Sequence, residues 1–282
     1  QKQSNRQVDF HAGDIQYAST DLLGNSEKEL FKKRKLQFLS ACAKQSIGRE
    51  DLINSINEWQ NSKILIIGDT IVDQFSACEA LGMSAEAPVL VVKELKSKNY
   101  LGGAAIVASH IRSLGAKCDL VSVVGEDDMA LFVKSELKDL DIGNLLISDS
   151  SRPTTFKKRY LVETQKLFRV SRIEDHNISE SKEKFLIERC EEAIKDANCI
   201  VISYFVYGVV TKNILKKLKE LSAKYKSPIF GDIQCSSQVG SILKFNDFSL
   251  LCPNEREARI AMQDKYSGLE SLSSELMKNT LS

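Results

Sequence analysis

From Lys63 onward, short apolar runs alternate with helical patterns, and this alternation constrains the fold more than any other feature of the sequence. Ile, Leu and Val dominate the runs, which predict strands at 63–67, 119–124, 198–203, 228–231 and 248–252. Apolar residues at helical spacing predict helices at 103–114, 129–140, 181–196, 212–224 and 254–263. Such alternation is typical of an α/β fold, in which a parallel sheet has helices on both faces.

Polar residues follow two of the expected strands. The first strand is followed by Gly68-Asp69 and then Asp73, and the second by Gly125-Glu-Asp-Asp128. Between them, the pair Gly102-Gly103 leads into an expected helix. Open α/β sheets bind ligands at the carboxyl ends of their strands, so these residues favour a small-molecule site. An ordinary βαβ unit with acidic turns would explain the same residues.

Two segments interrupt the alternation of strands and helices. The first is Pro88–Lys93, and the second consists of the runs Phe156–Val162 and Lys166–Val170. The latter pair alternates around Glu163-Thr-Gln165, which predicts a β-hairpin. An antiparallel flap beside a parallel sheet is a candidate lid.

The first 60 residues differ in character from the rest. Residues 1–26 are polar and predict a leader, and a helical linker is expected after them. The first linker helix, 27–46, contains the basic run Lys32–Lys35, which we interpret as a solvated face. Its apolar residues are Leu30, Phe31, Leu36, Leu39 and Cys42. A second helix carries Leu52, Ile53, Ile56 and Trp59, and we expect Trp59 to be a core residue.

The composition excludes several classes of partner. The 282 residues include 39 Lys and Arg against 38 Asp and Glu, so the net charge is almost zero. We therefore expect no nucleic-acid or anionic-membrane partner. No apolar run approaches the roughly 20 residues of a membrane-spanning helix. The seven scattered cysteines form no C-x-x-C pair, which indicates reduced thiols in a cytoplasmic protein rather than a zinc site.

Eight segments, taken together and in order, resemble the ribokinase-like (PfkB) carbohydrate kinases, and within them the bacterial heptose-phosphate kinases. They are Gly68–Asp73, Ala87–Val92, Leu101–Ala108, Leu114–Ala116, Val124–Asp128, Pro153–Arg159, Gln165–Arg169 and Pro253–Glu257. The resemblance implies a three-layer α/β/α sandwich over residues 61–282, with lid segments near 87–94 and 154–171. It also implies phosphorylation of a hydroxyl of a sugar or sugar phosphate by ATP and Mg²⁺, and a homodimer formed through lid strands.

The same resemblance assigns substrate-binding residues. Asp73 would accept hydrogen bonds from sugar hydroxyls, as carboxylates can. Gly102 and Gly103 would let the backbone approach the sugar, because glycine has no Cβ. Cations in the expected flap would hold a sugar phosphate, and arginine offers a two-pronged fork for it. These cations are Lys157, Arg159 and Arg169. A solvated basic hairpin is the alternative reading of the three.

Asn254 and Glu257 match the family's Asn-x-x-Glu motif, which orders magnesium and its water shell near the phosphates. Glu257 would act on Mg²⁺ through water, as magnesium-bound carboxylates often do. The alternative is a capping box at a helix start, with Asn254 as N-cap and Glu257 three residues later. The two roles are compatible.

The chain departs from the family pattern at several positions. Ile106 stands where the family commonly has Asn after Gly-Gly-Ala-Ala, which removes one sugar contact. Ser203-Tyr204-Phe205 replaces Ser-Asp-Tyr, and Asp232-Ile-Gln234 replaces Asp-Pro-Lys. We therefore expect a divergent sugar or a nonstandard sugar phosphate rather than heptose phosphate itself.

The family's Gly-Ala-Gly-Asp segment, which carries the general base and an anion hole, is expected downstream of Asn254 and is missing. The similar Ala12-Gly13-Asp14 is at the wrong end. We therefore expect an inactive fragment, incomplete at the C-terminus and with no catalytic residue of its own. Tyr17–Leu23 resembles the tail motif of nucleotidyltransferases fused to such kinases, although a capped helix explains it equally well.

Two other functions remain to be compared with a kinase. A binding or regulatory protein could keep the sugar pocket and lack catalysis; Ile106 favours this reading, while Asn254 and Glu257 count against it. A nicotinamide-dependent dehydrogenase is disfavoured, because no G-x-G-x-x-G follows the first strand and Asp69 puts a negative charge where a pyrophosphate would bind.

Overall fold

The computed structural model of the chain describes residues 27–163, 165–234 and 240–281, with side chains from residue 31 onward. The expected polar leader, including Ala12-Gly13-Asp14 and Tyr17–Leu23, lies outside these residues. The chain divides into two compact units, residues 1–61 and 62–282, and each is described by itself. No helix in the described part is long and apolar enough to cross a membrane.

The described part of the first unit, residues 27–61, contains two helices, α2 (Glu27–Lys44) and α3 (Arg49–Trp59). The N-terminus of α3 is closed by Asp51, whose Oδ2 accepts the Gly48 N–H at 2.7 Å. No residue of α3 is buried, and Trp59 is 40% exposed, so the prediction of Trp59 as a core residue is wrong. The two helices that the structure describes in this unit present too little apolar surface to enclose an indole ring.

The second unit is built on a six-stranded sheet in the order β10-β9-β8-β1-β4-β5, in which every neighbouring pair is parallel. Its strands are β1 (Lys63–Gly68), β4 (Lys117–Val124), β5 (Gly143–Ser148), β8 (Cys199–Tyr204), β9 (Ile229–Ile233) and β10 (Leu250–Leu251). The helices are α4 (Ala104–Ser113), α5 (Asp128–Asp139), α6 (Glu180–Ala193), α7 (Lys212–Tyr225), α8 (Glu255–Met262) and α9 (Leu269–Thr280). Short 3₁₀ turns cover Ile194–Asp196 and Ile242–Lys244.

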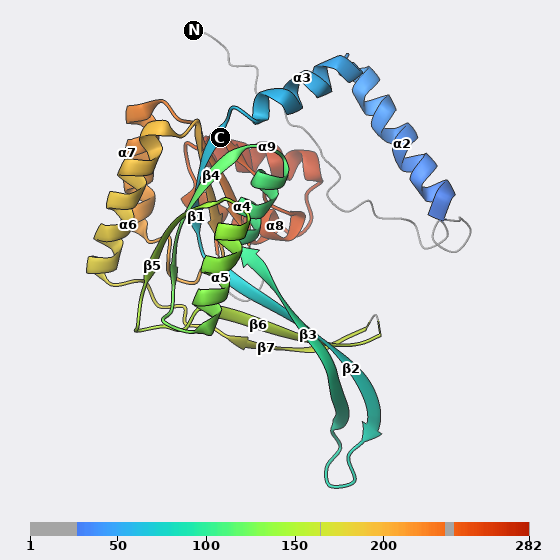
Figure 1. Cartoon of the computed structure of the whole chain (residues 1–282). Coiled ribbons are helices and arrows are strands. Elements are labelled where there is room, and N and C mark those ends of the chain that lie inside the picture. Colours follow the sequence, from blue (N-terminus) through green and yellow to red (C-terminus); the bar gives the residue numbers. More distant parts are fainter. Residues whose placement is uncertain (1–26, 164, 235–239, 282) are drawn as a thin grey trace. The chain divides into compact units, whose positions relative to one another are not determined.

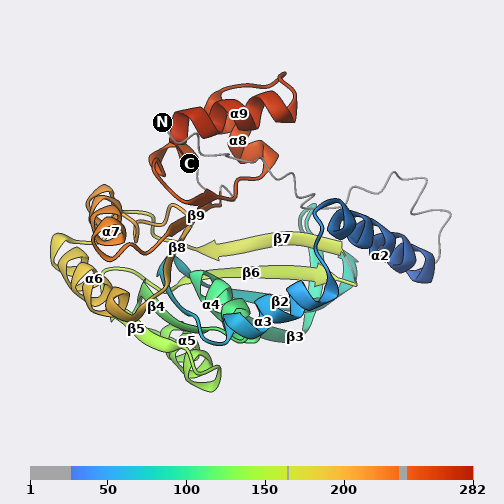
Figure 2. The same cartoon turned by 90° about the horizontal axis from the view of Figure 1, so that it is seen from above.

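The two faces of this sheet have separate hydrophobic cores, because successive strand residues point to opposite faces. Leu65 and Ile67 of β1 pack with α6 and α7, whereas Ile66 packs with α4 and α5. Figures 1 and 2 show these helix pairs on opposite sides of the sheet. The predicted α/β/α sandwich is therefore confirmed, although β5 and α9 were not foreseen.

A second sheet forms the lid, in the order β3-β2-β6-β7. Its strands are β2 (Thr70–Met83), β3 (Leu90–Gly103), β6 (Thr155–Val162) and β7 (Gln165–Arg172). β6 and β7 form the predicted antiparallel hairpin. The lid is larger than expected, because the segment near 87–94 belongs to a long β2–β3 hairpin that extends past the other lid strands (Figure 1). The lysine, serine and glutamate residues of β3 interrupt its apolar pattern, so the full strand could not be predicted from the sequence.

The lid joins the main sheet through Asp69, which separates β1 from β2. The carbonyl of Asp69 accepts the N–H of Ala104, the first residue of α4, at 2.9 Å. The preceding Gly103 has φ +58°, and a Cβ there would lie 2.1 Å from that carbonyl oxygen. Only glycine tolerates both conditions, so strand, lid and helix are fixed at one point.

A second junction connects α5 to the lid through Asp127, the N-cap of α5. Its Oδ1 accepts the Ala130 N–H and its Oδ2 accepts the Thr154 N–H, both at 2.9 Å. Burial acts to raise the pKa of Asp127, but hydrogen bonds from the Thr154 side chain and from these two N–H groups outweigh it, and the pKa is lowered. The ionised carboxylate therefore ties the start of β6 to the main sheet.

We predict that Asp127→Ala lowers the free energy of unfolding by about 1–2 kcal/mol at neutral pH, as loss of a helix N-cap does. Because the folded-state pKa is lowered, this contribution is present above the unfolded-state pKa of about 3.9 and is lost as the pH falls through the folded-state value. Urea unfolding as a function of pH measures it. The neighbouring exposed Asp128→Ala is the control, and an equal loss in both variants would contradict the prediction.

Candidate functional site

Asp73 on β2 and Gly102 on β3 lie against each other at the base of the lid. Gly102 pairs with Ile71, two residues from Asp73 on the same face of β2. A Cβ on Gly102 would lie 2.7 Å from the Asp73 Oδ2 atom, so any side chain there would displace the carboxylate. The structure thus brings together two of the predicted sugar-binding residues, with Gly103 next to them at the start of α4.

Several cations share the lid face that carries Asp73, which we call the basic face. Lys157 pairs with Asp73 across β2 and β6, and Arg169 pairs with Arg159 across β6 and β7. Arg159 Nη1 forms an ion pair with Asp73 Oδ1. Lys98, which pairs with Phe75, lies on the same face, as does Lys96, which pairs with Ala77. Lys98 was missed at the sequence level, although it stands at an even spacing from Gly102.

Lys157 differs from the other cations, because it is only 3% exposed. Its Nζ lies 5.4 Å from the ring centroid of Phe205 and 5.0 Å from that of Tyr207. These distances are within the range of cation–π attraction, which strengthens when the charge is desolvated. Lys157 is therefore directed at the loop after β8 and is not a solvated cation of a surface hairpin.

That loop, residues 205–210, wraps around the carboxylate of Asp69. Oδ2 accepts the N–H of Phe205 at 2.8 Å and that of Tyr207 at 3.4 Å, and Oδ1 accepts the N–H of Val209 at 3.3 Å. The residues between them, Val206 and Gly208, have φ of +65° and +85°. Such alternation turns successive N–H groups to one side and forms a concave anion site. Here the protein's own Asp69 fills it.

The Asp69 carboxylate holds this loop in an unfavourable conformation. A β-branched residue at positive φ costs free energy, so Val206 needs compensation from its surroundings. Asp69 is 1% exposed; burial raises its pKa, while the three N–H donors and Arg152 act in the opposite direction. In the sequence, Asp69 was noted only as part of a motif. Its contacts with the 205–210 loop could not be predicted, because that loop is distant in sequence.

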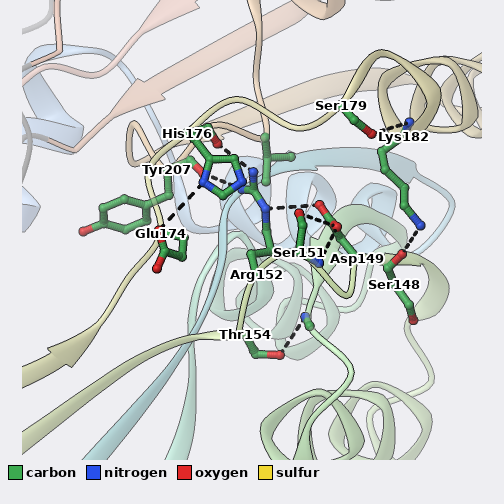
Figure 3. Close-up of polar contacts among 12 residues, drawn as sticks. Ser148, Asp149, Ser151, Arg152, Thr154, Glu174, His176, Ser179, Lys182 and Tyr207 are labelled. Carbon is green, nitrogen blue, oxygen red and sulfur yellow. Dashed lines mark hydrogen bonds and ion pairs between the residues drawn. The ribbon is translucent and has the colours of Figure 1, made fainter.

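Arg152 supports the same loop from its carbonyl side (Figure 3). It is 7% exposed and donates through Nη1 to the Tyr207 carbonyl at 3.0 Å and through Nη2 to the His176 carbonyl at 2.6 Å. Its Nε lies 3.2 Å from Asp149 Oδ2. The pKa of Asp149 is lowered, because hydrogen bonds from Ser151 together with Arg152 outweigh the effect of burial. No sequence pattern pointed to this arginine.

Asn254 and Glu257 form the capping box that was the alternative reading. Asn254 N–H donates to Glu257 Oε2, and Glu257 N–H donates to Asn254 Oδ1, each at 2.9 Å. The negative charge of Glu257 also affects Asp232 near the end of β9. The pKa of Asp232 is raised, mainly by burial and in addition by this charge. The described residues include no group of three or more side chains suited to a metal. Oxygen atoms of carboxylates and amides are of the kind that bind magnesium, often through water and with phosphates as further ligands.

Two of the departures from the family pattern belong to the hydrophobic core. Tyr204 is 7% exposed, and its ring centroid lies 5.9 Å from that of Phe245. Ile106 is partly buried and packs with the α4–α5 core. Positions at which the family pattern has polar residues are thus used here for packing.

We predict that Asp69→Asn lowers the free energy of unfolding by about 2–3 kcal/mol, because a carboxamide loses the charge and turns an NH₂ group toward buried donors. Hydrogen exchange at the amides of Phe205, Tyr207 and Val209 should become faster at the same time. The control is Asp119→Asn, which weakens the partly exposed pair with Lys63 (2.8 Å) and should cost about 1 kcal/mol or less. Equal losses with unchanged loop exchange would show that Asp69 does not hold the loop.

Residues 61–279 match the pfkB family of carbohydrate kinases. Over 212 residues the chain is 37% identical to the bifunctional protein HldE of Campylobacter jejuni, covering 75% of this chain and 43% of that protein. It is 30% identical over 207 residues to the bifunctional protein HldE of Helicobacter hepaticus, covering 72% of this chain and 42% of that protein. The chain therefore spans less than half the length of these curated relatives.

Solved structures agree on the fold. Arabidopsis thaliana ribokinase complexed with ribose and ATP aligns with a TM-score of 0.56 at 16% identity, covering 77% of this chain and 68% of that one. The tetrameric inhibited form of Escherichia coli phosphofructokinase-2 aligns with a TM-score of 0.58 at 15% identity, covering 78% and 70%. The family match and the shared architecture lead to one conclusion: the chain belongs to the pfkB family of carbohydrate kinases and has the ribokinase-like fold.

Proposed function

We propose that the protein containing this chain uses ATP and Mg²⁺ to phosphorylate a hydroxyl of a sugar or sugar phosphate. In this proposal the chain supplies the sugar pocket, the lid and part of the magnesium site. The observation that carries it is the Asp73 carboxylate, held against Gly102 on the basic face of the lid, in a chain of the pfkB family.

The pocket residues have distinct roles. Asp73 accepts hydrogen bonds from sugar hydroxyls, and its ion pair with Arg159 fixes the direction of the carboxylate. Gly102 and Gly103 bring the backbone close to the sugar. Arg159 and Arg169 present guanidinium groups to a phosphate on the substrate. The buried Lys157 adds positive charge behind them, where it raises the attraction for an anionic substrate.

Asn254 and Glu257 would hold magnesium through water. The bound metal would supply positive charge against the charge that develops on the transferred phosphoryl group. Phosphoryl transfer depends mainly on positioning and electrostatics, and positioning of the acceptor sugar is what the lid provides. We assign no general base to the residues of this chain.

Partners follow from the same family. The substrate is a small sugar or sugar phosphate, and the similarity to the bifunctional HldE proteins favours a place in nucleotide-sugar biosynthesis in the cytoplasm. A homodimer through the lid is part of the proposal, because the long β2–β3 hairpin exposes Leu81, Met83, Leu90 and Leu95. Such apolar side chains on an edge hairpin favour contact with another surface.

A second candidate is a sugar-binding protein of the same fold without catalysis. The core positions of Ile106 and Tyr204 favour it, since both replace polar residues of the family pattern. Turnover separates the two functions: a kinase releases ADP when its sugar is added, whereas a binding protein binds the sugar and leaves ATP unchanged.

We predict that Asp73→Ala lowers kcat/KM for the sugar about 10–100-fold, the loss expected when a charged hydrogen-bond acceptor is removed from a substrate. ADP release by the longer protein, assayed with a panel of sugars and sugar phosphates, measures it. The control is Asp141→Asn, which affects an exposed ion pair with Arg112. No sugar-dependent ADP release, or equal activity of Asp73→Ala and wild type, would reject the proposed role.

Gly102→Ala tests the pocket geometry without changing charge. The new methyl group would overlap the Asp73 carboxylate, so we predict weaker sugar binding in the same direction as for Asp73→Ala. Calorimetric titration of the same panel of sugars into this chain measures it. Gly268→Ala is the matched control, because a Cβ there meets nothing within 4 Å. If both variants bind as the wild type does, Asp73 is not the acceptor.

A further inference from the structure

Arg152 is a buried charge that neither the sugar pocket nor the magnesium site uses. It lies between β5 and β6, yet its guanidinium reaches two other segments of the chain (Figure 3). One is the connection from β7 to α6, at the His176 carbonyl, and the other is the 205–210 loop, at the Tyr207 carbonyl. Three segments that are distant in sequence are therefore held by one side chain.

The loop is fixed from two sides at the same residue. The Tyr207 N–H donates to Asp69, and the Tyr207 carbonyl accepts from Arg152. The next residue packs on the His176 segment: the Gly208 carbonyl accepts the Ile178 N–H at 3.1 Å, and a Cβ on Gly208 would lie 2.0 Å from the His176 carbonyl oxygen. The peptide units on both sides of the Tyr207 ring have little freedom to rotate.

The ring held in this way contacts the lid. Tyr207 and Phe205 lie with ring centroids 6.3 Å apart, and the Nζ of Lys157 lies over both. Lys157 is on β6, next to Asp73 in register, so the ring pair meets the lid at the pocket. Arg152 also lies just before β6, and His176 follows β7, which places the guanidinium at the base of this hairpin.

We propose that Arg152 is a positioning residue for the lid: it holds the Phe205 and Tyr207 rings where they receive Lys157, and so sets the basic face against the pocket. The inference rests on the proposed function only in treating that face as a wall of the sugar pocket. Lysine at this position would not suffice, because one ammonium nitrogen cannot reach two carbonyls and Asp149, whereas the planar fork of arginine can.

The test reads Lys157 directly and needs no ligand. Rings shift the resonances of nuclei above them, so in a chain labelled with ¹³C-lysine the Lys157 ε-methylene should be displaced upfield from the exposed lysines. Lys157→Arg assigns the signal, and Tyr207→Leu should move it toward the others. We expect Arg152→Lys also to move the Lys157 signal toward those of the exposed lysines, although this variant keeps every atom of Lys157 and of the two rings.

Arg112→Lys is the matched control, since Arg112 likewise donates to two carbonyls, those of Leu140 and Ala116, and pairs with Asp141. It should lower the thermal midpoint without moving the Lys157 signal. Asp149→Asn, which leaves both carbonyl contacts of Arg152 in place, should also keep the signal.

A folded Arg152→Lys protein that retains the shifted signal would overturn the proposal and leave Arg152 a stabilising residue only. Should that variant not fold, Arg152→Gln takes its place, because a carboxamide can bond one of the two carbonyls; a retained signal overturns the proposal there too. If Arg152→Lys moves the Lys157 signal as expected but no sugar is turned over, the proposed function alone is rejected.

Discussion

The fold of the second unit depends on the buried carboxylate of Asp69. Asp69 is the first residue after β1. Its carbonyl accepts the N–H of the first residue of α4, and its carboxylate accepts three N–H groups of the loop after β8. Parallel sheets collect such loops at their carboxyl edge, where ligands usually bind. In this chain the side chain of the residue that follows β1 occupies the anion site of the loop. The loop is thereby held in place by the protein's own side chain.

The lid depends on the same point. Strand β2 leaves the main sheet immediately after Asp69, and β3 returns to it at Gly103. On the other side of the lid, Asp127 and Arg152 hold the start of β6, and Arg152 holds the segment after β7. In the proposed function, a lid fixed in this way, with Lys157 over two aromatic rings, would present its cations to the sugar with little loss of side-chain entropy on binding. Such preorganisation suits phosphoryl transfer, in which positioning supplies much of the catalysis.

Much of the fold could be predicted from sequence, because apolar strands and amphipathic helices have different periods. That contrast identified β1, β4, β8 and the helices around them, and the alternation around Glu163 identified the hairpin. It did not reveal β2 and β3 at their full length, since a lid strand with few apolar contacts has no apolar pattern to read. Trp59 was misassigned, because helical spacing alone does not show what covers a helix.

The candidate site shows the same division. Asp73, Gly102 and the flap cations were found through motifs, and the structure puts them on adjoining strands. The partners of Asp69 and Arg152 could not be found, since Asp69 and Phe205 are separated by 136 positions and their contact is made by backbone groups that carry no sequence signature. Lys157 was predicted to hold a sugar phosphate because of its place in the hairpin. Its contacts with Phe205 and Tyr207 could not be predicted, because these rings lie in another segment.

The most direct test of a sugar pocket at the base of the lid is a titration of the ¹⁵N-labelled chain with sugars and sugar phosphates, followed by amide chemical shifts. The account predicts saturable shifts for at least one ligand, centred on Asp73, Gly102, Gly103 and Arg159, with little change in α6 and α7. Absence of saturable shifts across the panel, or shifts centred away from the base of the lid, would contradict it.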